Sequence, residues 1–271
     1  MTARLHYLFT RFNVALSSEA LPTSDAWLSS RLALFERFAV DSVIRQTVKD
    51  FKWVVAFDDR SPAWFRTEIE NRTGNLFEPV WISGKFDATK LIQSLRLPQN
   101  EAYSFLSTRM DNDDAVAEDF VEAIQHAAKS SNAEFLNLTN GLQYSAGRVY
   151  SRLDPSNPFI SRQEQVEVGS SPRTVFERQH DQLRELGSIQ QVRLSPLWMQ
   201  IVHDENLANS IKGVRADPRK VTGFSPSIEL VPIGRLRLTA ERARTAVRMG
   251  LRVVSRPSRI RWLIRSLTGS R

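Results

Sequence analysis

The sequence predicts an α/β fold in which a mainly parallel sheet is flanked by helices and a basic helical extension follows at the C-terminus. Two observations support this expectation. In the first half of the chain, short apolar runs alternate with segments that repeat apolar residues every three or four positions. Such alternation is typical of parallel strands joined by helices. Residues 235–271, in turn, mix arginine with apolar residues at helical spacing, which predicts the extension.

Short apolar runs, several of them aromatic or β-branched, mark the expected strands. Polar residues follow most of these runs, and the acids, serine and proline after residue 57 are a loop signature that ends a strand. The expected strands cover residues 5–14, 51–57, 79–82, 103–110 and 134–138, and a further apolar strand begins near residue 196.

Helical spacing of apolar residues predicts a helix over residues 27–38, and Ser24 or Asp25 is in position to cap it. Residues 174–186 also have the pattern of a helix. Proline and serine interrupt the chain elsewhere in its second half, so we expect loops there. These loops cover residues 151–165, 167–174 and 214–227.

The length and composition limit the number of domains and the classes of site that this chain can contain. A chain of 271 residues fits one large α/β domain, or one domain with an appendage. The absence of cysteine excludes disulfides, cysteine-ligated metals and thiol nucleophiles. No apolar run approaches the roughly 18–20 residues of a membrane-spanning helix, and the first residues are too polar for a signal peptide. We therefore expect a cytoplasmic protein, with a peripheral position on the inner membrane face as an option.

Charge is distributed unevenly along the chain. Residues 235–271 contain eleven arginines, no lysine and one acid, Glu241, so their net charge is +10. The net charge of the whole chain is +7. Residues 1–234 therefore carry −3. We interpret residues 1–234 as the main domain and residues 235–271 as a basic amphipathic tail that meets an anionic partner.

Asp111, Asn112, Asp113 and Asp114 form an acidic cluster where an expected strand ends and an amphipathic pattern over residues 116–128 begins. In a parallel sheet, ligands bind beyond the carboxyl ends of the strands. Two carboxylates in a D-x-D spacing can reach one divalent cation, and Mg²⁺ or Mn²⁺ prefers oxygen ligands. The alternative is a solvated turn in which Asp113 or Asp114 caps the following helix.

Several segments, taken in order and with their spacing, resemble the bacterial rhamnosyltransferase family of the GT-A glycosyltransferases. The resemblance covers roughly residues 5 to 210 and rests on TRFN, RLALFERFAVDSVIRQTVKDFKWVVAFDD, TRMDNDDAVAEDFVEAIQ, NPF and LWMQIVHDEN. It implies a GT-A fold, a nucleoside diphosphate sugar as donor, and Mn²⁺ or Mg²⁺ held by the D-x-D acids. In such enzymes the metal offsets the charge that develops on the departing nucleoside diphosphate.

The resemblance also implies roles for particular residues around the D-x-D acids. Asp111 would lie near the ribose or the metal, and Asp113 would be a direct metal ligand. His203, after the late apolar strand, would be a further metal ligand, because neutral imidazole is an acceptable ligand for Mn²⁺; the alternative is an ordinary loop residue. Arg109 would pair with a phosphate, or would balance the local acids.

The polar ends of the first two strands would bind the nucleoside part of the donor. Thr10, Arg11 and Phe12 would line the nucleobase and ribose pocket, although Phe12 is equally suited to the core. Asp58, at the end of the second strand, would contact the nucleoside.

An inverting transferase needs a carboxylate base to take the proton from the acceptor hydroxyl, whereas a retaining one does not. Asp181, at the start of a helix in GT-A fashion, is the first candidate, and Glu164 is its rival. Exposed acids beside arginines are the alternative interpretation of both. His180 could approach the donor or the acceptor, while His6 and His126 are expected to be structural.

The C-terminal tail interleaves arginine with apolar residues and Trp262, which suits an anionic membrane interface. A helix packed on the domain or on a partner is the alternative, and nucleic acid is not expected because the rest of the chain is acidic. We predict a metal-dependent glycosyltransferase that moves a hexose or deoxyhexose, such as rhamnose, onto a glycan or lipid-linked acceptor in polysaccharide biosynthesis. The alternatives are a non-catalytic nucleotide-sugar-binding or membrane-associated interaction protein, and a phosphate-ester hydrolase.

Overall fold

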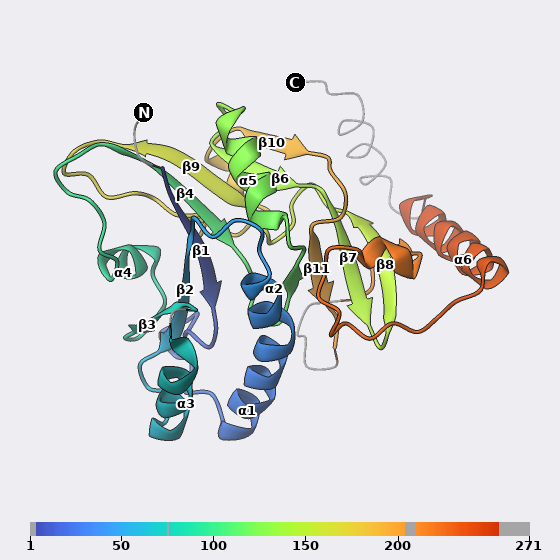
Figure 1. The fold of residues 1–271 in the computed structure, drawn as a ribbon, viewed down its shortest axis with the longest axis horizontal. Helices are drawn as coiled ribbons and strands as arrows, with labels where there is room; N and C mark the ends of the chain where they lie inside the picture. The colour runs from blue at the N-terminus through green and yellow to red at the C-terminus, as the bar shows by residue number, and fades with distance from the viewer. Residues whose placement is uncertain (1–3, 75, 204–209, 255–271) are drawn as a thin grey trace.

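Two β-sheets lie beside each other in the computed structural model, which describes residues 4–74, 76–203 and 210–254 (Figure 1). The larger sheet has the strand order β10-β6-β9-β4-β1-β2-β3. Its strands are β1 (Arg4–Arg11), β2 (Lys52–Asp58), β3 (Glu78–Ile82), β4 (Tyr103–Arg109), β6 (Phe135–Leu138), β9 (Ser161–Val166) and β10 (Ile189–Val192). Strands β1 to β4 run parallel, whereas β9 is antiparallel to both of its neighbours.

The smaller sheet has the strand order β12-β8-β7-β11-β5. It consists of β5 (Ala115–Val116), β7 (Asn140–Ser145), β8 (Arg148–Leu153), β11 (Trp198–Ile201) and β12 (Val214–Arg215). Strand β4 ends only a few residues before β5 begins, so one short turn connects the two sheets. That turn contains the acidic cluster.

Helices cover both faces of the larger sheet. On one face, Leu8, Val55 and Leu106 pack with side chains of the helices after β1 and β5, and on the other face Tyr7 and Val54 pack with the helix after β3. The period of two along each strand produces this division. The helices are α1 (Asp25–Leu34), α2 (Asp41–Ile44), α3 (Ala63–Thr73), α4 (Ala88–Gln93), α5 (Phe120–Lys129) and α6 (Arg235–Val254), with a π-helix η1 (Phe35–Val40) and 3-10 turns η2 (Leu183–Glu185) and η3 (Pro218–Val221).

The predicted α/β fold with a mainly parallel sheet is confirmed, and all the expected strands are present within a few residues. The helix expected from residue 27 is confirmed as α1, and Ser24 caps it by accepting a hydrogen bond from the Trp27 amide at 3.3 Å. The π-helix and α2 continue this helix to Ile44.

The helix expected over residues 174–186 is wrong, since this segment contains the 3-10 turn η2 and is otherwise non-helical. Val175 and Leu183 are instead buried against Phe135 and Ile160, so the apolar spacing reflects a loop packed on the sheet. The loop expected over residues 151–165 is also wrong in part. Strand β8 ends within it, and β9 begins at Ser161.

The expectation that Asp113 or Asp114 caps the helix after the acidic cluster is also wrong. Helix α5 begins at Phe120, with Asp119 at the N-cap position, and β5 separates it from the cluster. The carboxylate of Asp114 instead accepts a hydrogen bond from the backbone amide of Ile201, on β11. Asp114 therefore makes a contact with a residue distant in sequence and does not cap the following helix.

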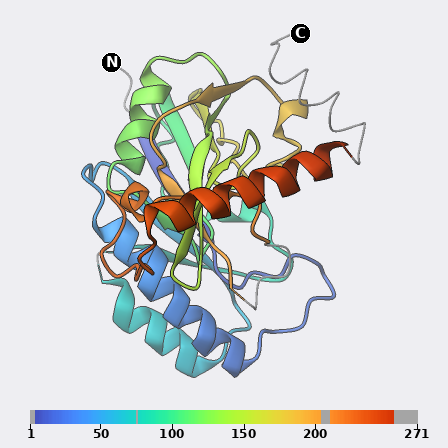
Figure 2. The ribbon, with the colours of Figure 1, turned by 90° about the vertical axis from the view of Figure 1, so that its right-hand side faces the viewer.

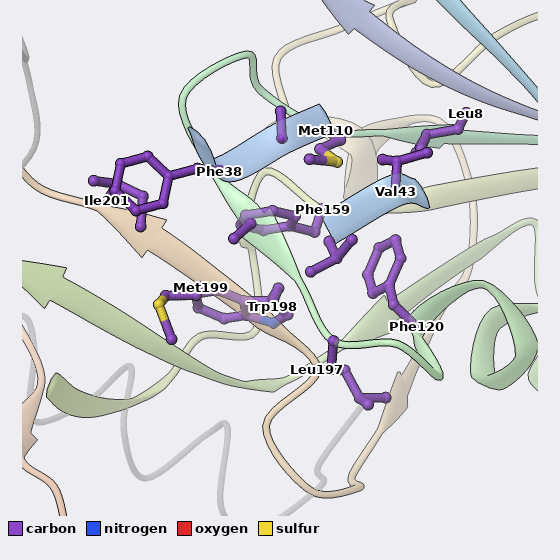
Figure 3. Close-up of a cluster of buried hydrophobic side chains, with 14 of the residues drawn as sticks. Leu8, Phe38, Val43, Met110, Phe120, Phe159, Leu197, Trp198, Met199 and Ile201 are labelled. Carbon is purple, nitrogen blue, oxygen red and sulfur yellow. The ribbon is translucent and has the colours of Figure 1, made fainter. Parts of the chain in front are cut away.

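The core between the two sheets depends on a close approach of β11 to β7. Trp198 stacks on Phe159 with ring centroids 5.1 Å apart, and both lie among apolar side chains from β11 and from the η1–α2 segment (Figure 3). The Trp198 indole N–H donates to the carbonyl of Leu138 at 2.6 Å, which fixes the ring. A Cβ added at Gly141 would lie 2.1 Å from that ring, so this position on β7 accepts glycine alone without displacement.

Helix α6 lies along the outer edge of the smaller sheet, beside β12 (Figures 1 and 2). Its first residue, Arg235, begins the basic tail defined from the sequence, and residues 255–271 of that tail lie outside the described part of the chain. Among the residues that the structure describes, no helix has both the length and the apolar character needed to cross a membrane.

Replacing Gly141 with alanine should lower the free energy of unfolding by about 1–3 kcal/mol or more, because the fixed Trp198 ring must move to admit the methyl group. Urea unfolding measures the change. Gly234→Ala is the matched control, since nothing lies within 4 Å of the added Cβ there. Equal stability of the two variants would contradict the close packing of β7 on β11.

Burial of His6 should make the stability of the protein fall in mild acid. Burial, and then the charge of Arg4, lowers the pKa of His6 from 6.5 to about 3, and its ring bonds to Thr108 at 2.9 Å. Below pH 6.5 the unfolded chain binds a proton that the folded protein rejects. The free energy of unfolding should therefore fall by about 1.4 kcal/mol per pH unit from this group as the pH drops from 6.5 toward 3.

His6→Asn removes this contribution, and urea unfolding at several pH values should show a shallower slope in that range. His126, exposed on α5, provides the control, because His126→Asn should leave the slope unchanged. A slope that survives His6→Asn would assign the acid sensitivity to other groups.

Candidate active site

The acidic cluster lies at the carboxyl ends of β1 and β4, the edge of a parallel sheet where ligands bind. Backbone and side-chain hydrogen bonds hold it against the end of β1. The amide of Met110 donates to the carbonyl of Phe9 at 3.0 Å, and the Asn112 side chain donates to the carbonyl of Phe12 at 2.7 Å. The turn is therefore fixed across the ends of both strands.

Asp113 is buried, and among the described residues it contacts two basic side chains from distant parts of the chain. Its Oδ2 lies 2.5 Å from Nη1 of Arg31, on α1, and 3.0 Å from Nε2 of His203, which follows β11. Burial opposes the charge of Asp113, but the contacts with His203 and Arg31 outweigh it and lower the pKa of this carboxyl. Asp113 is therefore an ionised carboxylate at neutral pH.

The pKa of Asp114 shifts in the opposite direction. It is almost fully buried, and the burial, together with the negative charges of Asp113 and Asp111, raises its pKa well above the usual value. Its Oδ1 accepts from the Ile201 amide at 2.9 Å. This bond places the end of β11, and hence His203, beside the cluster. Local sequence patterns do not indicate this structural role, because the bond joins residues 87 positions apart.

Asp111 and Arg109 form a bidentate pair on the open side of the cluster. The Arg109 guanidinium donates to Oδ1 of Asp111 at 2.9 and 3.1 Å and to Oδ2 at 3.1 Å. The Asp111 side chain is 32% exposed, against 10% for Asp113, so it is the carboxylate that a ligand in solvent reaches first.

Arg11 lies near this pair, at the end of β1. Its guanidinium carbon is 4.9 Å from the centre of the Phe176 ring and 5.5 Å from that of Phe86, and Arg109 is 5.9 Å from the same Phe176 ring. Burial, and then the charge of Arg109, lowers the pKa of Arg11 to about 10. Within the described residues no hydrogen-bond acceptor is directed at the Arg11 guanidinium, and the two arginines contact the same ring with the carboxylate of Asp111 as a nearby negative charge.

A hollow of about 200 Å³ opens at this point. It brings together the ends of β1, the first turns of α1 and the acidic cluster, and its lining residues are Arg11, Phe12, Val14, Leu16, Trp27, Arg31, Asp111, Asn112 and Asp113. Trp27 and Arg31 were not predicted as site residues. Arg31 occupies an otherwise apolar face at helical spacing, and a charge at such a position indicates a buried ion pair.

Two of the residues expected at the nucleoside pocket lie behind it. The Thr10 hydroxyl is buried and accepts from the indole N–H of Trp53 at 3.0 Å. Asp58 is buried at the end of β2, where hydrogen bonds from the Arg60 side chain lower its pKa. Of the residues expected there, Arg11 and Phe12 line the hollow, and Phe12 also packs in the aromatic core.

The two base candidates are differently placed. Glu164, on β9, is paired in register with Phe105 and therefore lies about 10 Å back along the sheet from Thr108, near the end of β4. Its carboxylate accepts from the backbone amide and the side chain of Arg173. The structure thus does not bring Glu164 to the acidic cluster.

Asp181 is exposed in the segment that packs over β9, directly after His180. Burial, and then the charge of Arg109, lowers the pKa of His180, while the charges of Asp111 and Asp181 act in the other direction. His180 therefore lies within electrostatic reach of the Arg109–Asp111 pair, and its segment is the one that approaches the site.

The donor set fits a divalent metal in part. Asp113 and His203 offer a carboxylate and an imidazole at one point, and Mg²⁺ or Mn²⁺ commonly takes one or two protein ligands with water and phosphate oxygens completing the shell. Among the described residues no group of three acidic or histidine side chains converges on one point, and Asp111 is bound to Arg109. A metal at Asp113 would also compete with Arg31 for Oδ2.

The acidic turn and the arginines lie at the carboxyl edge of a mainly parallel α/β sheet, which is where α/β enzymes bind their ligands. The chain belongs to the family described as "Putative rhamnosyl transferase", whose family model matches residues 15–215. This family is one of glycosyltransferases, and the resemblance expected from the sequence is confirmed.

Two solved structures illustrate how distant the similar folds are. TarS 1-349 from S. aureus in complex with UDP-GlcNAc has 10% sequence identity and a TM-score of 0.42, and the match covers 74% of this chain and 60% of TarS 1-349. A 4-diphosphocytidyl-2C-methyl-D-erythritol synthase from Anaerococcus prevotii has 12% identity and a TM-score of 0.35, with 89% and 95% of the two chains covered. The chain thus spans about 60% of the length of TarS 1-349. No curated protein sequence matches this chain.

Replacing Arg31 with methionine should lower the free energy of unfolding by about 3–5 kcal/mol, because Asp113 then keeps its buried charge with one basic partner fewer. Arg72→Met is the control: the Arg72 side chain is 39% exposed in its pairs with Glu36 and Glu68, where surface ion pairs contribute about 0–1 kcal/mol. Urea unfolding distinguishes the two cases. Equal losses would show that the Arg31–Asp113 pair is not stabilising the folded state.

Proposed function

We propose that this protein transfers a hexose or deoxyhexose, rhamnose among them, from a nucleoside diphosphate sugar to a glycan or lipid-linked acceptor in polysaccharide biosynthesis. The observation that carries the proposal is the hollow at the carboxyl edge of β1 and β4, where Arg11, Asp111 and Asp113 meet. Family membership supports sugar transfer as the reaction. The donor sugar and the acceptor belong to the proposal.

In this proposal the donor diphosphate binds beside Arg11 and Arg109. Like charges held close together raise each other's energy, and an anion placed between them relieves the repulsion. The Phe176 ring supports both guanidinium groups, which keeps them at the edge of the hollow. The nucleoside lies against Phe12 and Arg11, whereas Thr10 and Asp58 stay outside the hollow, bound to Trp53 and Arg60.

The metal in this proposal is held by Asp113 and His203, with Asp111 turning from Arg109 to complete the site. When bound, Mn²⁺ or Mg²⁺ offsets the charge that develops on the departing nucleoside diphosphate. Arg31, on α1, holds the Asp113 carboxylate in one position through its ion pair. Asp114 fixes the other side by holding the end of β11.

Asp181 is the base that we propose for an inverting reaction. Its segment approaches the Arg109–Asp111 pair through His180, and its carboxylate is exposed to an incoming acceptor. Glu164 is the less suitable of the two, because Arg173 binds its carboxylate and its register places it away from the hollow.

Nucleoside diphosphates or their sugars should raise the thermal midpoint of the purified protein, and the rise should be larger with Mn²⁺. A ligand at 100 times its dissociation constant stabilises the folded state by about 2.7 kcal/mol. Asp113→Asn should remove the Mn²⁺-dependent part of the shift. Arg109→Gln should weaken the nucleotide shift with and without metal, because it removes a phosphate partner.

Arg45→Gln, an exposed arginine outside the hollow, is the matched control and should leave the shifts unchanged. Release of the nucleoside diphosphate in the presence of a glycan acceptor then tests transfer. Binding without any release would favour the non-catalytic nucleotide-sugar-binding protein, and cleavage of a simple phosphomonoester would favour the hydrolase. A midpoint that no nucleotide moves would contradict the donor site itself.

A further inference from the structure

Helix α6 has one face directed at the domain and one directed at solvent. On the inner face, Leu238 is buried, and Arg242 donates from Nε to the carbonyl of Arg215 at 3.1 Å. Glu241 accepts from the buried Arg215 at 3.2 Å and from the exposed Arg237 at 3.2 Å, so the one acid of the tail links the helix to the domain and pairs with one of its exposed arginines. These contacts attach the first half of the helix to β12 and fix its rotation about its own axis.

The outer face carries an apolar stripe. At 100° per residue, Leu236, Ala240, Ala243 and Val247 fall within about 60° of one another and roughly opposite Leu238. All four are exposed, Leu236 at 90% and Val247 at 63%. The spacing continues in the sequence with Leu251 and Val254. We call residues 236, 240, 243 and 247 the outer stripe of α6.

Arginines border the outer stripe on both sides. Arg235 lies toward one side and Arg237 and Arg244 toward the other, and all three are exposed, whereas Arg242 lies nearer the inner face. Together with Arg248 and Arg252 in the sequence, α6 contains six arginines, no lysine and one acid. A helix of this kind presents an apolar surface framed by positive charge.

We infer that the outer stripe of α6 and its bordering arginines dock on an anionic lipid bilayer. A bilayer surface supplies both an apolar phase for the stripe and phosphate groups for the arginines. A second copy of the same helix would bring like charges together around the stripe, and nucleic acid would supply phosphates without an apolar phase. Charge complementarity therefore selects the bilayer among these partners.

The sequence after α6 has the same character. Residues 255–271, outside the described part of the chain, add five arginines to Ile260, Trp262, Leu263 and Ile264. The inference goes beyond sugar transfer and does not require it, although a lipid-linked acceptor would lie at the same surface.

Vesicle flotation with the full chain tests the inference without any donor or acceptor. Large unilamellar vesicles of phosphatidylcholine alone should not retain the protein, whereas vesicles containing phosphatidylglycerol should. The binding should weaken as salt is raised, because exposed charges are screened over about 10 Å at 0.1 M. Failure to bind anionic vesicles at low salt would overturn the inference while leaving the proposed transfer reaction intact.

Two double variants separate the apolar and the charged contributions. Leu236→Gln with Val247→Gln should weaken binding by roughly tenfold or more, since it removes the apolar side chains of the stripe without a change of charge. Arg235→Gln with Arg244→Gln should weaken it by roughly fivefold for each arginine. Both pairs are exposed, so near-ultraviolet circular dichroism should show an unchanged fold.

Matched controls lie elsewhere on the surface. Leu21→Gln with Val168→Gln removes side chains that are 86% and 60% exposed, and Arg45→Gln with Arg96→Gln removes two exposed arginines outside α6. Both should leave vesicle binding unchanged. Normal binding by the stripe variant would assign the membrane contact to residues 255–271 and overturn a role for α6. The protein could instead self-associate without binding vesicles. If the stripe variant abolished that self-association, the outer stripe would be assigned to contact with a second copy of the chain.

Discussion

The short turn between β4 and β5 is the constraint on which the rest of the structure depends. It joins the larger sheet to the smaller one, and three of its polar side chains hold different elements. Asn112 bonds to the end of β1, Asp113 to α1 and to His203, and Asp114 to the end of β11. Because the same side chains connect the sheets and line the hollow, the geometry of the site and the assembly of the fold cannot change independently.

The charges around this turn are balanced at close range. Three neighbouring carboxyl groups could not all ionise in a buried position without large repulsion. The structure resolves the conflict by pairing Asp111 with Arg109, pairing Asp113 with Arg31 and His203, and raising the pKa of Asp114. In the proposed reaction, an incoming diphosphate or cation would therefore exchange with existing ion pairs instead of meeting a bare cluster of acids.

Ion pairs also determine the charge of helix α6, which lies at the edge of the smaller sheet. Its single acid pairs with the buried Arg215 and with Arg237, and the remaining arginines and the outer stripe leave the exposed part of the helix basic and apolar. A main domain with a slightly negative charge and a strongly positive tail has an oriented charge distribution, and such a molecule approaches an anionic surface tail first. Anchoring and sugar chemistry would then be assigned to separate parts of one chain.

The sequence by itself determined the local features: strands β1 to β4, β6 and β11, helix α1 with its Ser24 cap, the acidic cluster at the end of β4, and the basic tail. These depend on residue periodicity and on charge within a few positions, which a sequence displays directly. The tertiary structure alone decided that Arg31 meets Asp113 across 82 residues and that Ile201 meets Asp114 across 87. It also decided that residues 174–186 pack as a loop rather than a helix. Burial on a sheet and burial along a helix can give the same apolar spacing, and which side chains meet depends on strand order, which local periodicity does not encode.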